Sequence, residues 1–272
     1  MPESLGLVGG AGVLPALVAR EARRAGWRVI AFALDDPAGF SDVVDRVVPC
    51  RVGDVGPIVD ALVEEAIRHV VLAGRISKHG LFRGELLDQA ARALVARSPD
   101  WTDDGLLRTA TTALAALGIE LLDQRRFLAA WLAPVGHAAG PALSEAARAD
   151  VGCGLRIARD LGRHGIGQTV VVRNGTVVAV EAMEGTDETI RRGLALAGPG
   201  AVVVKATGPS HDYRFDVPTI GPATLALCGE GRAAALAVEA DRVLLLDRER
   251  IASDAERMGI SVVGVGGDLP TD

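Results

Sequence analysis

Aromatic residues are scarce in this 272-residue chain, where phenylalanine, tryptophan and tyrosine together make up 3% of the sequence. Hydrophobic residues nevertheless reach 49%, so the core has to be built from alanine, valine, leucine and isoleucine. A chain of this length buries a sizeable core without disulfides or metal ions. Length predicts two domains, with one large α/β domain as the alternative.

Cysteines and long apolar runs are also rare, and there is no basic surplus. Cys50, Cys153 and Cys228 lie far apart and lack metal-ligand spacing, which argues against a disulfide framework and a zinc module. No apolar run approaches the roughly 20 residues that span a bilayer, although contact with a membrane surface stays open. A net charge of −6 argues against a general nucleic-acid binder. Because Met1–Ala11 has no basic-then-apolar leader, we expect a cytoplasmic location.

Lysine is nearly missing. Of the 29 basic residues only Lys78 and Lys205 are lysines, and the other 27 are arginines. Lys205 ends an apolar, strand-like run, whereas Lys78 follows Ser77 in a loop. A compact ammonium group is a common point-charge ligand of phosphate, and arginine favours forked, planar contacts. We therefore predict that Ser77, Lys78 and Lys205 contact phosphate; the alternative is the chance survival of two surface lysines.

The first half of the chain alternates short apolar strands with helices. Strands are predicted over 5–8, 28–34 and 69–73, and helices over 16–25, 57–67, 84–96, 104–117 and 125–132. Such alternation indicates a mostly parallel sheet with helices on its faces, a Rossmann-like arrangement. We assign residues 1–133 to this N-terminal domain. Ala133–Pro141 is rich in glycine, proline and alanine and has no periodicity, so it is predicted to be the linker.

Residues 141–272 are predicted to form a second, mixed α/β domain. A long helix over 144–161 precedes two strand-like runs, 168–173 and 176–181, that meet at Asn174-Gly175. Asn-Gly supplies the positive φ angles of a type I′ turn, so these runs predict a β-hairpin. A helix over 187–196 and strands over 201–205, 233–238, 243–246 and 260–263 complete the domain.

The most informative stretch is His211–Gly221, which sets Asp212, Arg214 and Asp216 at alternating positions. Side chains alternate between the faces of an extended segment, so these three are predicted to share one face. Two anions flanking a cation suit a divalent metal and a phosphate group. The aspartates would hold the metal or deprotonate water, and Arg214 would clamp a phosphate oxygen or lock the two acids. His211 would position water or bridge to phosphate.

A second acidic group, Glu181, Glu184 and Asp187, follows the hairpin where a strand gives way to a helix. With the two aspartates above it makes five candidate ligands for Mg2+, which takes oxygen ligands and completes its octahedron with water and substrate phosphate. Thr186, in the same turn, is predicted to bind substrate. The alternative is that Asp187 simply favours a helix N-terminus and Glu184 is solvated.

Gly9, Gly10 and Gly12 form a predicted turn between a strand and a helix. Backbone N–H groups and a positive helix end meet there, which makes an anion site. The Gly-x-Gly spacing, with Asp35 or Asp36 about 20 residues on, fits part of a dinucleotide fingerprint, but proline stands at the third glycine position. An NAD(P)-dependent oxidoreductase is therefore an alternative function, and a tight turn without ligand is the simpler explanation of these residues.

Four motifs occur in one order along the chain. They are Gly9-Gly10-x-Gly12-x-Leu14-Pro15, Asp103-Asp104-x-Leu106-Leu107-Arg108, Glu181-Ala182-x-Glu184-Gly185-Thr186-Asp187 and Asp212-x-Arg214-x-Asp216-x-Pro218-x-Ile220-Gly221. Together they resemble the metal-dependent UDP-2,3-diacylglucosamine pyrophosphatases of lipid A synthesis, the type that attacks the α-phosphorus. The resemblance runs from about Leu5 to Gly264.

The resemblance implies hydrolysis of UDP-2,3-diacylglucosamine to UMP and 2,3-diacylglucosamine 1-phosphate (lipid X), with Mg2+ or, in its place, Mn2+. It implies two α/β domains that close on the substrate, a homodimer, and peripheral contact with the inner membrane. Asp216, Asp212, Arg214 and Lys205 would carry out catalysis. The family usually has a lysine and a glutamine near the acidic pair, where this chain has Gly208 and His211. A non-catalytic nucleotide-sugar-binding protein is the second alternative.

Overall fold

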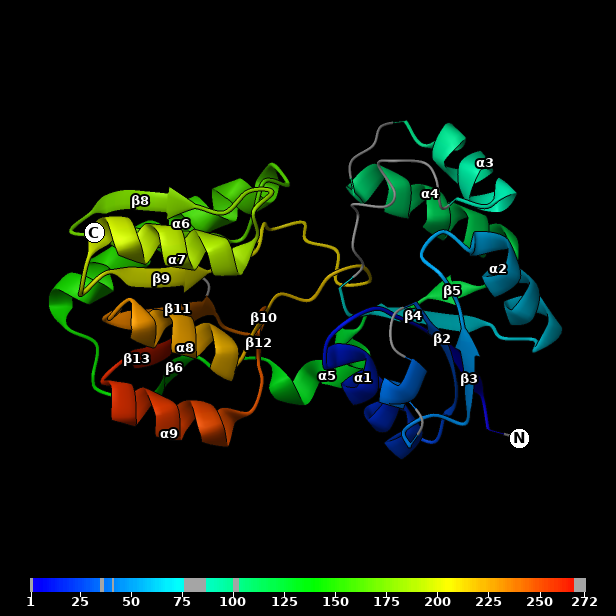
Figure 1. Ribbon diagram of the computed structural model, residues 1–272, viewed down its shortest axis with the longest axis horizontal. Helices are drawn as coiled ribbons and strands as arrows, with labels where there is room; N and C mark the ends of the chain where they lie inside the picture. The colour runs from blue at the N-terminus through cyan, green and yellow to red at the C-terminus, as the bar shows by residue number, and fades with distance from the viewer. Residues whose placement is uncertain (1, 35–36, 41, 76–86, 100–102, 267–272) are drawn as a thin grey trace. The chain divides into compact units, whose positions relative to one another are not determined.

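The computed structural model describes residues 2–34, 37–40, 42–75, 87–99 and 103–266. The chain groups into two compact α/β units (Figure 1). Unit 1 comprises residues 1–129 together with the short segment 212–216, and unit 2 comprises residues 130–211 and 217–272. The predicted α/β class is therefore confirmed. The acidic motif that we assigned to the second domain groups with unit 1 instead.

Unit 1 contains a five-stranded, wholly parallel sheet in the order β3-β2-β1-β4-β5. Its strands are β1 (Ser4–Gly9), β2 (Arg28–Ala33), β3 (Arg46–Pro49), β4 (His69–Ala73) and β5 (Glu120–Leu121). This order is that of a Rossmann-like sheet. The sequence did not predict β3 and β5, because runs of four and two residues are too short to show a hydrophobic period.

The helices of unit 1 cover both faces of this sheet. They are α1 (Leu14–Arg24), α2 (Val55–Glu64), α3 (Gln89–Arg97), α4 (Asp103–Ala116) and α5 (Arg125–Leu128). The 3-10 turn η1 (Pro37–Phe40) also belongs to unit 1, and η2 (Ala129–Trp131) spans the boundary between the units in the sequence. Leu62 of α2 and Leu114 of α4 pack with Phe32 in one core cluster. Leu5 and Leu7 alternate to the other face, where α1 packs on β1 and β2.

Unit 2 contains a six-stranded mixed sheet in the order β6-β13-β11-β9-β7-β8. Its strands are β6 (Gly136–Ala139), β7 (Thr169–Arg173), β8 (Thr176–Val180), β9 (Val202–Lys205), β11 (Ala235–Glu239) and β13 (Ser261–Val265). The last three are parallel neighbours, whereas β6, β7 and β8 pair antiparallel. The predicted hairpin is confirmed, with φ of 48° at Asn174 and 74° at Gly175. Unit 2 also contains a two-stranded parallel sheet, formed by β10 (Thr219–Ile220) and β12 (Leu244–Leu245).

The predicted linker needs a correction, because residues 136–139 form β6, an edge strand of the unit 2 sheet. Gly140, which follows this strand, is required by backbone conformation and packing. Gly140 has φ of 73°, and a Cβ there would lie 1.9 Å from the carbonyl oxygen of Ile260. A stretch without periodicity can still pair at a sheet edge, because pairing uses the backbone.

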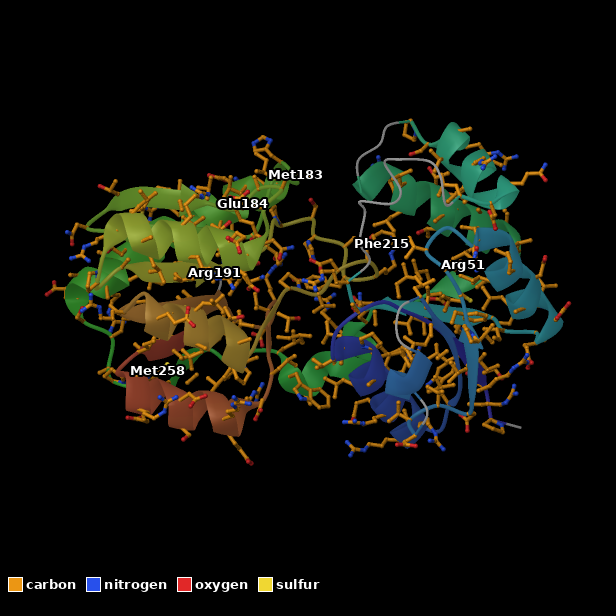
Figure 2. The ribbon with its side chains drawn as sticks, in the orientation of Figure 1. Arg51, Met183, Glu184, Arg191, Phe215 and Met258 are labelled. Atoms are coloured by element: carbon orange, nitrogen blue, oxygen red, sulfur yellow. The ribbon has the colours of Figure 1, made fainter. Side chains whose placement is uncertain are left out.

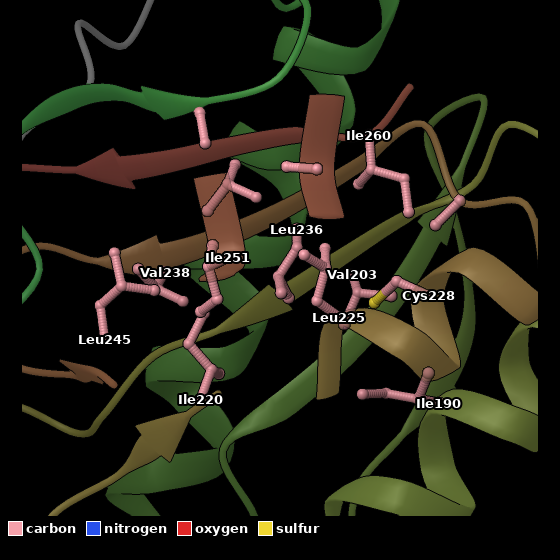
Figure 3. Packing of buried hydrophobic residues seen from close by; sticks show 14 of the residues in the cluster. Ile190, Val203, Ile220, Leu225, Cys228, Leu236, Val238, Leu245, Ile251 and Ile260 are labelled. Atoms are coloured by element: carbon pink, nitrogen blue, oxygen red, sulfur yellow. The ribbon is translucent and has the colours of Figure 1, made fainter. Parts of the chain in front are cut away.

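The core of unit 2 follows the two faces of its sheet. Val203, Leu236 and Val262 point to one face with residues of α7 (Thr186–Ala197), α8 (Pro222–Glu230) and α9 (Arg248–Met258) (Figure 3). Val202 and Val204 point to the opposite face, against α6 (Glu145–Arg163). Strand period two therefore buries both faces. None of the helices in the described ranges combines the length and apolar character needed to cross a bilayer.

Candidate functional site

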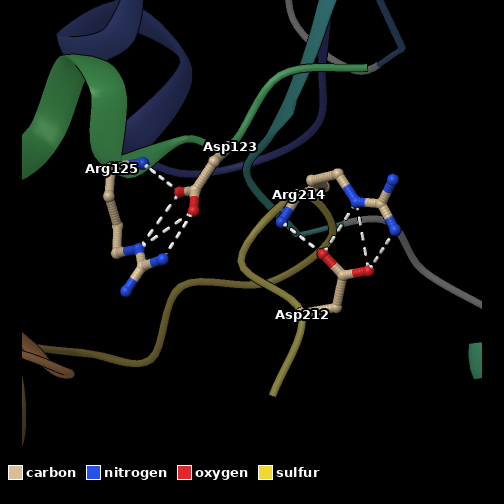
Figure 4. Close-up of polar contacts among 4 residues, drawn as sticks. All are labelled: Asp123, Arg125, Asp212 and Arg214. Carbon is tan, nitrogen blue, oxygen red and sulfur yellow. Dashed lines mark hydrogen bonds and ion pairs between the residues drawn. The ribbon is translucent and has the colours of Figure 1, made fainter. Parts of the chain in front are cut away.

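The segment Asp212–Asp216 is a turn, not an extended strand (Figure 4). The Asp212 carboxylate accepts a hydrogen bond from the N–H of Arg214 at 3.0 Å, and the N–H of Phe215 bonds to the Asp212 carbonyl oxygen at 3.2 Å. The guanidinium of Arg214 also grips the carboxylate, with Nε 3.0 Å from Oδ1 and Nη2 2.6 Å from Oδ2. The prediction of three alternating side chains on one face is wrong, because the aspartate closes an Asx-type turn on its own backbone.

The aromatic residues of this turn attach it to unit 1. Phe215 packs against the core cluster of unit 1, and Tyr213 is 5% exposed. Asp216, at the end of the turn, is exposed. Of the two interpretations left open for Arg214, the structure shows it bound to Asp212. Its Nη1 group makes no bond to that carboxylate (Figure 4).

A second turn of the same composition lies beside the first in unit 1. Asp123 accepts hydrogen bonds from the N–H of Arg125 at 2.8 Å and from its Nη2 at 2.6 Å. Both turns therefore have the pattern Asp-x-Arg, with the arginine gripping the aspartate two residues before it (Figure 4). The sequence reasoning missed Asp123 and Arg125, although the repeated Asp-x-Arg spacing was visible.

The two turns keep their guanidinium groups charged. The pKa of Arg125 is raised above the usual range of arginine, mainly by its hydrogen bonds to Asp123. The pKa of Arg214 is raised mainly by its hydrogen bonds to Asp212, and the charge of Asp123 adds to that rise. Both arginines are therefore cationic at neutral pH, each beside the carboxylate that its guanidinium binds.

In unit 2, Lys205 lies at the carboxyl end of β9, as predicted, and is 7% exposed. Its Nζ donates to the hydroxyl of Thr186 at 2.8 Å, and that hydroxyl donates to Glu181 Oε1 at 2.9 Å. Glu181 Oε2 accepts from the N–H of Gln168 at 3.2 Å. Among the described residues, no carboxylate lies within ion-pair distance of Lys205. A buried ammonium whose partner is a hydroxyl group favours an anionic ligand.

Glu184 and Asp187 have a more structural character. Glu184 accepts from Arg192 Nη2 at 2.6 Å and from the hydroxyl of Thr189 at 3.3 Å, at the start of α7. Bonds to backbone N–H and then to Arg192 lower the pKa of Glu184. Asp187 is exposed in the first turn of α7. Figure 2 shows Glu184 in the loop that joins β8 to α7. The position of Asp187 agrees with the alternative given for it, a residue that favours a helix N-terminus, and the exposed Glu184 bonds to its own loop and to α7.

The residues between Lys205 and the acidic turn are fixed by a buried network. Glu239, at the carboxyl end of β11, accepts from the N–H of Thr207 at 2.9 Å and from Arg159 Nε at 2.9 Å. A Cβ added to Gly208 would lie 2.6 Å from the carbonyl carbon of Gly162 in α6. Backbone packs on backbone there, so a lysine cannot replace Gly208 without moving the chain. His211, half-buried, follows this network.

The three glycines of the turn after β1 have different roles in the structure. Gly9 is required by packing, since a Cβ would lie 2.4 Å from Phe40 Cζ. The N–H groups of Gly10 and Ala11 bond to carbonyls of β4 and the residues after it, at 2.9 Å each. Gly12 has φ of 101° and borders, with Gly10, a pocket of about 170 Å³. Ligand pockets usually measure about 300–1,000 Å³, so this space suits a phosphate better than a whole dinucleotide.

The five predicted metal ligands are divided between the two units. Asp212 and Asp216 belong to unit 1, and Glu181, Glu184 and Asp187 belong to unit 2. Within the described ranges, no three histidine, cysteine, aspartate or glutamate side chains form a metal-binding group. Mg2+ is nevertheless commonly held by one or two carboxylates, with water and substrate phosphate completing the shell. Ser77, Lys78, Asp35 and Asp36 lie outside the described residues.

Polar groups therefore collect where parallel strands end in both units: the glycine turn after β1, Lys205 after β9 and Glu239 on β11. This defines a two-unit α/β protein with polar groups at the carboxyl ends of its strands, the edge at which α/β folds of this class bind their ligands. The chain belongs to the LpxI family. Residues 4–131 match the LpxI N-terminal domain and residues 134–263 the LpxI C-terminal domain.

One curated relative is similar over nearly the full length. It is named UDP-2,3-diacylglucosamine pyrophosphatase LpxI, from Caulobacter vibrioides, and is 33% identical over 276 residues, covering 96% of this chain and 97% of the relative. Solved structures are far less similar. N5-carboxyaminoimidazole synthetase from Staphylococcus aureus is 15% identical with a TM-score of 0.24 over 68% of this chain. The Thermotoga maritima ribonucleotide synthetase is 13% identical with a TM-score of 0.25. This chain spans 42% of each.

Proposed function

We propose that this protein hydrolyses UDP-2,3-diacylglucosamine to UMP and 2,3-diacylglucosamine 1-phosphate, a step of lipid A biosynthesis. The observation that supports the proposal is its full-length similarity to a curated pyrophosphatase of that name, at 33% identity. The chemistry of the chain agrees with it. The buried Lys205, the charged Arg214 and the exposed Asp216 suit an anionic diphosphate.

In the proposed reaction, water adds to the α-phosphorus and the bond from that phosphorus to the bridging oxygen breaks. The sugar 1-phosphate leaves, and the water oxygen stays in UMP. Asp216, exposed at the end of the turn, is the acid proposed to accept the water proton. Lys205 and the Nη1 group of Arg214 bind phosphate oxygens, and Thr186 and Glu181 fix the ammonium group.

Mg2+ is proposed as the cofactor, with Mn2+ as a substitute. When bound, it neutralises charge on the phosphate oxygens that would repel the nucleophile. Asp216 and Asp212 are the carboxylates of this chain that would hold it. The predicted homodimer and the peripheral contact with the inner membrane remain predictions.

The test is hydrolysis of UDP-2,3-diacylglucosamine by the pure protein with Mg2+ in water enriched in oxygen-18. We expect UMP to form with one heavy oxygen from the solvent, and the sugar phosphate to stay light. A heavy sugar phosphate would contradict attack at the α-phosphorus. Absence of UMP at every metal concentration would contradict the function itself.

Two substitutions test the proposed roles of Asp216 and Lys205. We expect Asp216→Asn and Lys205→Met to lower kcat by about 100-fold or more, since loss of a proton acceptor or a buried phosphate ligand commonly costs that much. Asp160→Asn is the matched control, because Asp160 is a surface acid of α6 paired with Arg163. If both site variants keep wild-type turnover with saturating Mg2+ while staying folded, these roles are wrong.

A further inference from the structure

The two Asp-x-Arg turns of unit 1 are joined by their middle residues. The N–H of Gln124 donates to the carbonyl oxygen of Tyr213 at 3.2 Å. The Cζ atom of Arg125 lies 3.7 Å from the centre of the Tyr213 ring. Gln124 is 1% exposed and Tyr213 5% exposed, whereas the side chain of Arg125 is 37% exposed. The ring is therefore buried beneath a half-exposed cation, and a cation over an aromatic face at that distance is attracted to it.

Arg125 is itself held rigidly in place. Its Nε and Nη2 groups bond to both oxygens of Asp123 (Figure 4). These bonds fix the guanidinium group whose Cζ atom lies over the Tyr213 ring. The adjacent Arg126 makes a weaker contact of the same kind, 5.3 Å from the ring of Trp27, and is exposed. The two neighbouring arginines thus differ in one respect that matters here: Arg125 contacts the acidic turn.

We propose that Arg125 is a positioning residue for the reaction. It holds Tyr213 by the face of its ring, and through Tyr213 it sets the place of Asp216, three residues further along the same turn. The proposal rests on the proposed function, in which Asp216 acts on water at the diphosphate. Asp123 serves the same purpose by orienting Arg125.

The kinetic test compares Arg125→Ala, Arg125→Lys and the control Arg126→Ala. We expect Arg125→Ala to lower kcat about 10- to 100-fold with KM changed less than threefold, because a misplacement of about 1 Å costs on that order. Lysine keeps a cation that can lie over the ring but cannot fork to Asp123, so it should restore part of kcat. Arg126→Ala should keep wild-type kcat.

A spectroscopic readout separates positioning from a general loss of folding. Tyr213 is the single tyrosine of the chain, so protein grown with 3-fluorotyrosine gives one fluorine-19 resonance. We expect that resonance to shift and broaden in Arg125→Ala and to stay unchanged in Arg126→Ala. If Arg125→Ala does not fold, the lysine variant must show the lower kcat together with a shifted resonance.

Three results would overturn the proposal. Arg125→Ala with wild-type kcat would do so, and so would a change confined to KM. A fluorine resonance that is the same with and without Arg125 would show that the arginine does not hold the ring. Failure of the proposed function looks different: the wild-type protein then releases no UMP, although the resonance still responds to Arg125→Ala.

Discussion

At the residue scale, Lys205 and Glu239 are both buried, but they differ in how well the fold balances their charge. Lys205 is buried with a hydroxyl partner, and Glu239 is buried between Arg159 and the backbone N–H of Thr207. The second group is satisfied by the fold, and such groups are usually structural. The first keeps a charge that the described residues do not balance with a carboxylate. Because Lys205 is buried without a carboxylate partner among the described residues, it is a better candidate than Glu239 for binding a ligand.

Cys228 gives a prediction about pH. Burial in the core of unit 2 raises the pKa of this thiol to about 12. An unfolded cysteine ionises near pH 8.5, so above that pH the unfolded chain binds fewer protons than the folded one. Stability should therefore be complete below about pH 8.5 and fall as the pH rises toward 12.

The measurement is urea unfolding at pH 7.0 and at about pH 9.5 for the wild-type protein and for Cys228→Ala. We expect the wild-type protein to lose more stability between the two pH values than the variant. In the folded wild-type protein, iodoacetamide at pH 8 should modify the half-buried Cys153 before Cys228. Rapid labelling of Cys228 under native conditions would show that the thiol is not buried as described.

At the scale of elements, the segment that follows β9 packs so closely against α6 that no side chain fits between them. A Cβ at Gly162 would lie 2.3 Å from the backbone nitrogen of Gly208, and neither backbone can rotate away. Gly208 is three residues beyond Lys205, so this close approach also fixes the start of the path to the acidic turn. The glycine that replaces the expected lysine is a packing requirement.

Gly162→Ala should therefore destabilise the protein by about 1–3 kcal/mol, the usual cost of overpacking. Gly229→Ala in α8 is the matched control, since its Cβ would meet the flexible end of Met258 at 2.6 Å. Alanine is a better helix former than glycine by about 1 kcal/mol, so the control should be neutral or slightly stabilising. Thermal unfolding measures both; equal melting temperatures for the two variants would contradict the packing argument.

At the scale of the whole molecule, the chain passes between the units three times. The chain enters unit 1 for the second time at residue 212 and leaves it after residue 216. These five residues group with unit 1, although the residues on either side group with unit 2. Phe215 provides the apolar contact that attaches this segment, by packing on the core of unit 1. The segment therefore ties a late part of the sequence to the first sheet.

Phe215→Ala should detach the segment and cost about 2 kcal/mol, less than the 3–5 kcal/mol of a fully buried phenylalanine. The peptide bond after Arg214 should then become open to trypsin, while the wild-type turn resists cleavage there. Phe215→Leu keeps an apolar side chain and should protect the bond. Brief digestion followed by mass spectrometry reads out the site. Equal cleavage after Arg214 in all three proteins would show that Phe215 does not hold the turn.

Local signals in the sequence determined much of the fold. Strand–helix alternation predicted the parallel sheet of unit 1, and Asn174-Gly175 predicted the hairpin, because turn chemistry and hydrophobic period act over a few neighbouring residues. The position of Lys205 at a strand end was also visible. These features depend on short-range geometry, which the order of residues fixes directly.

The tertiary structure alone decided three other matters. It made Asp212–Asp216 a turn, since hydrogen bonds to the Asp212 carboxylate and burial of Phe215 outweighed the alternating pattern. It set the segment in unit 1 beside Asp123 and Arg125, almost 90 residues earlier in the chain. It also paired residues 136–139 with β13. Each depends on contacts between residues far apart in sequence, whose energies a local pattern does not contain.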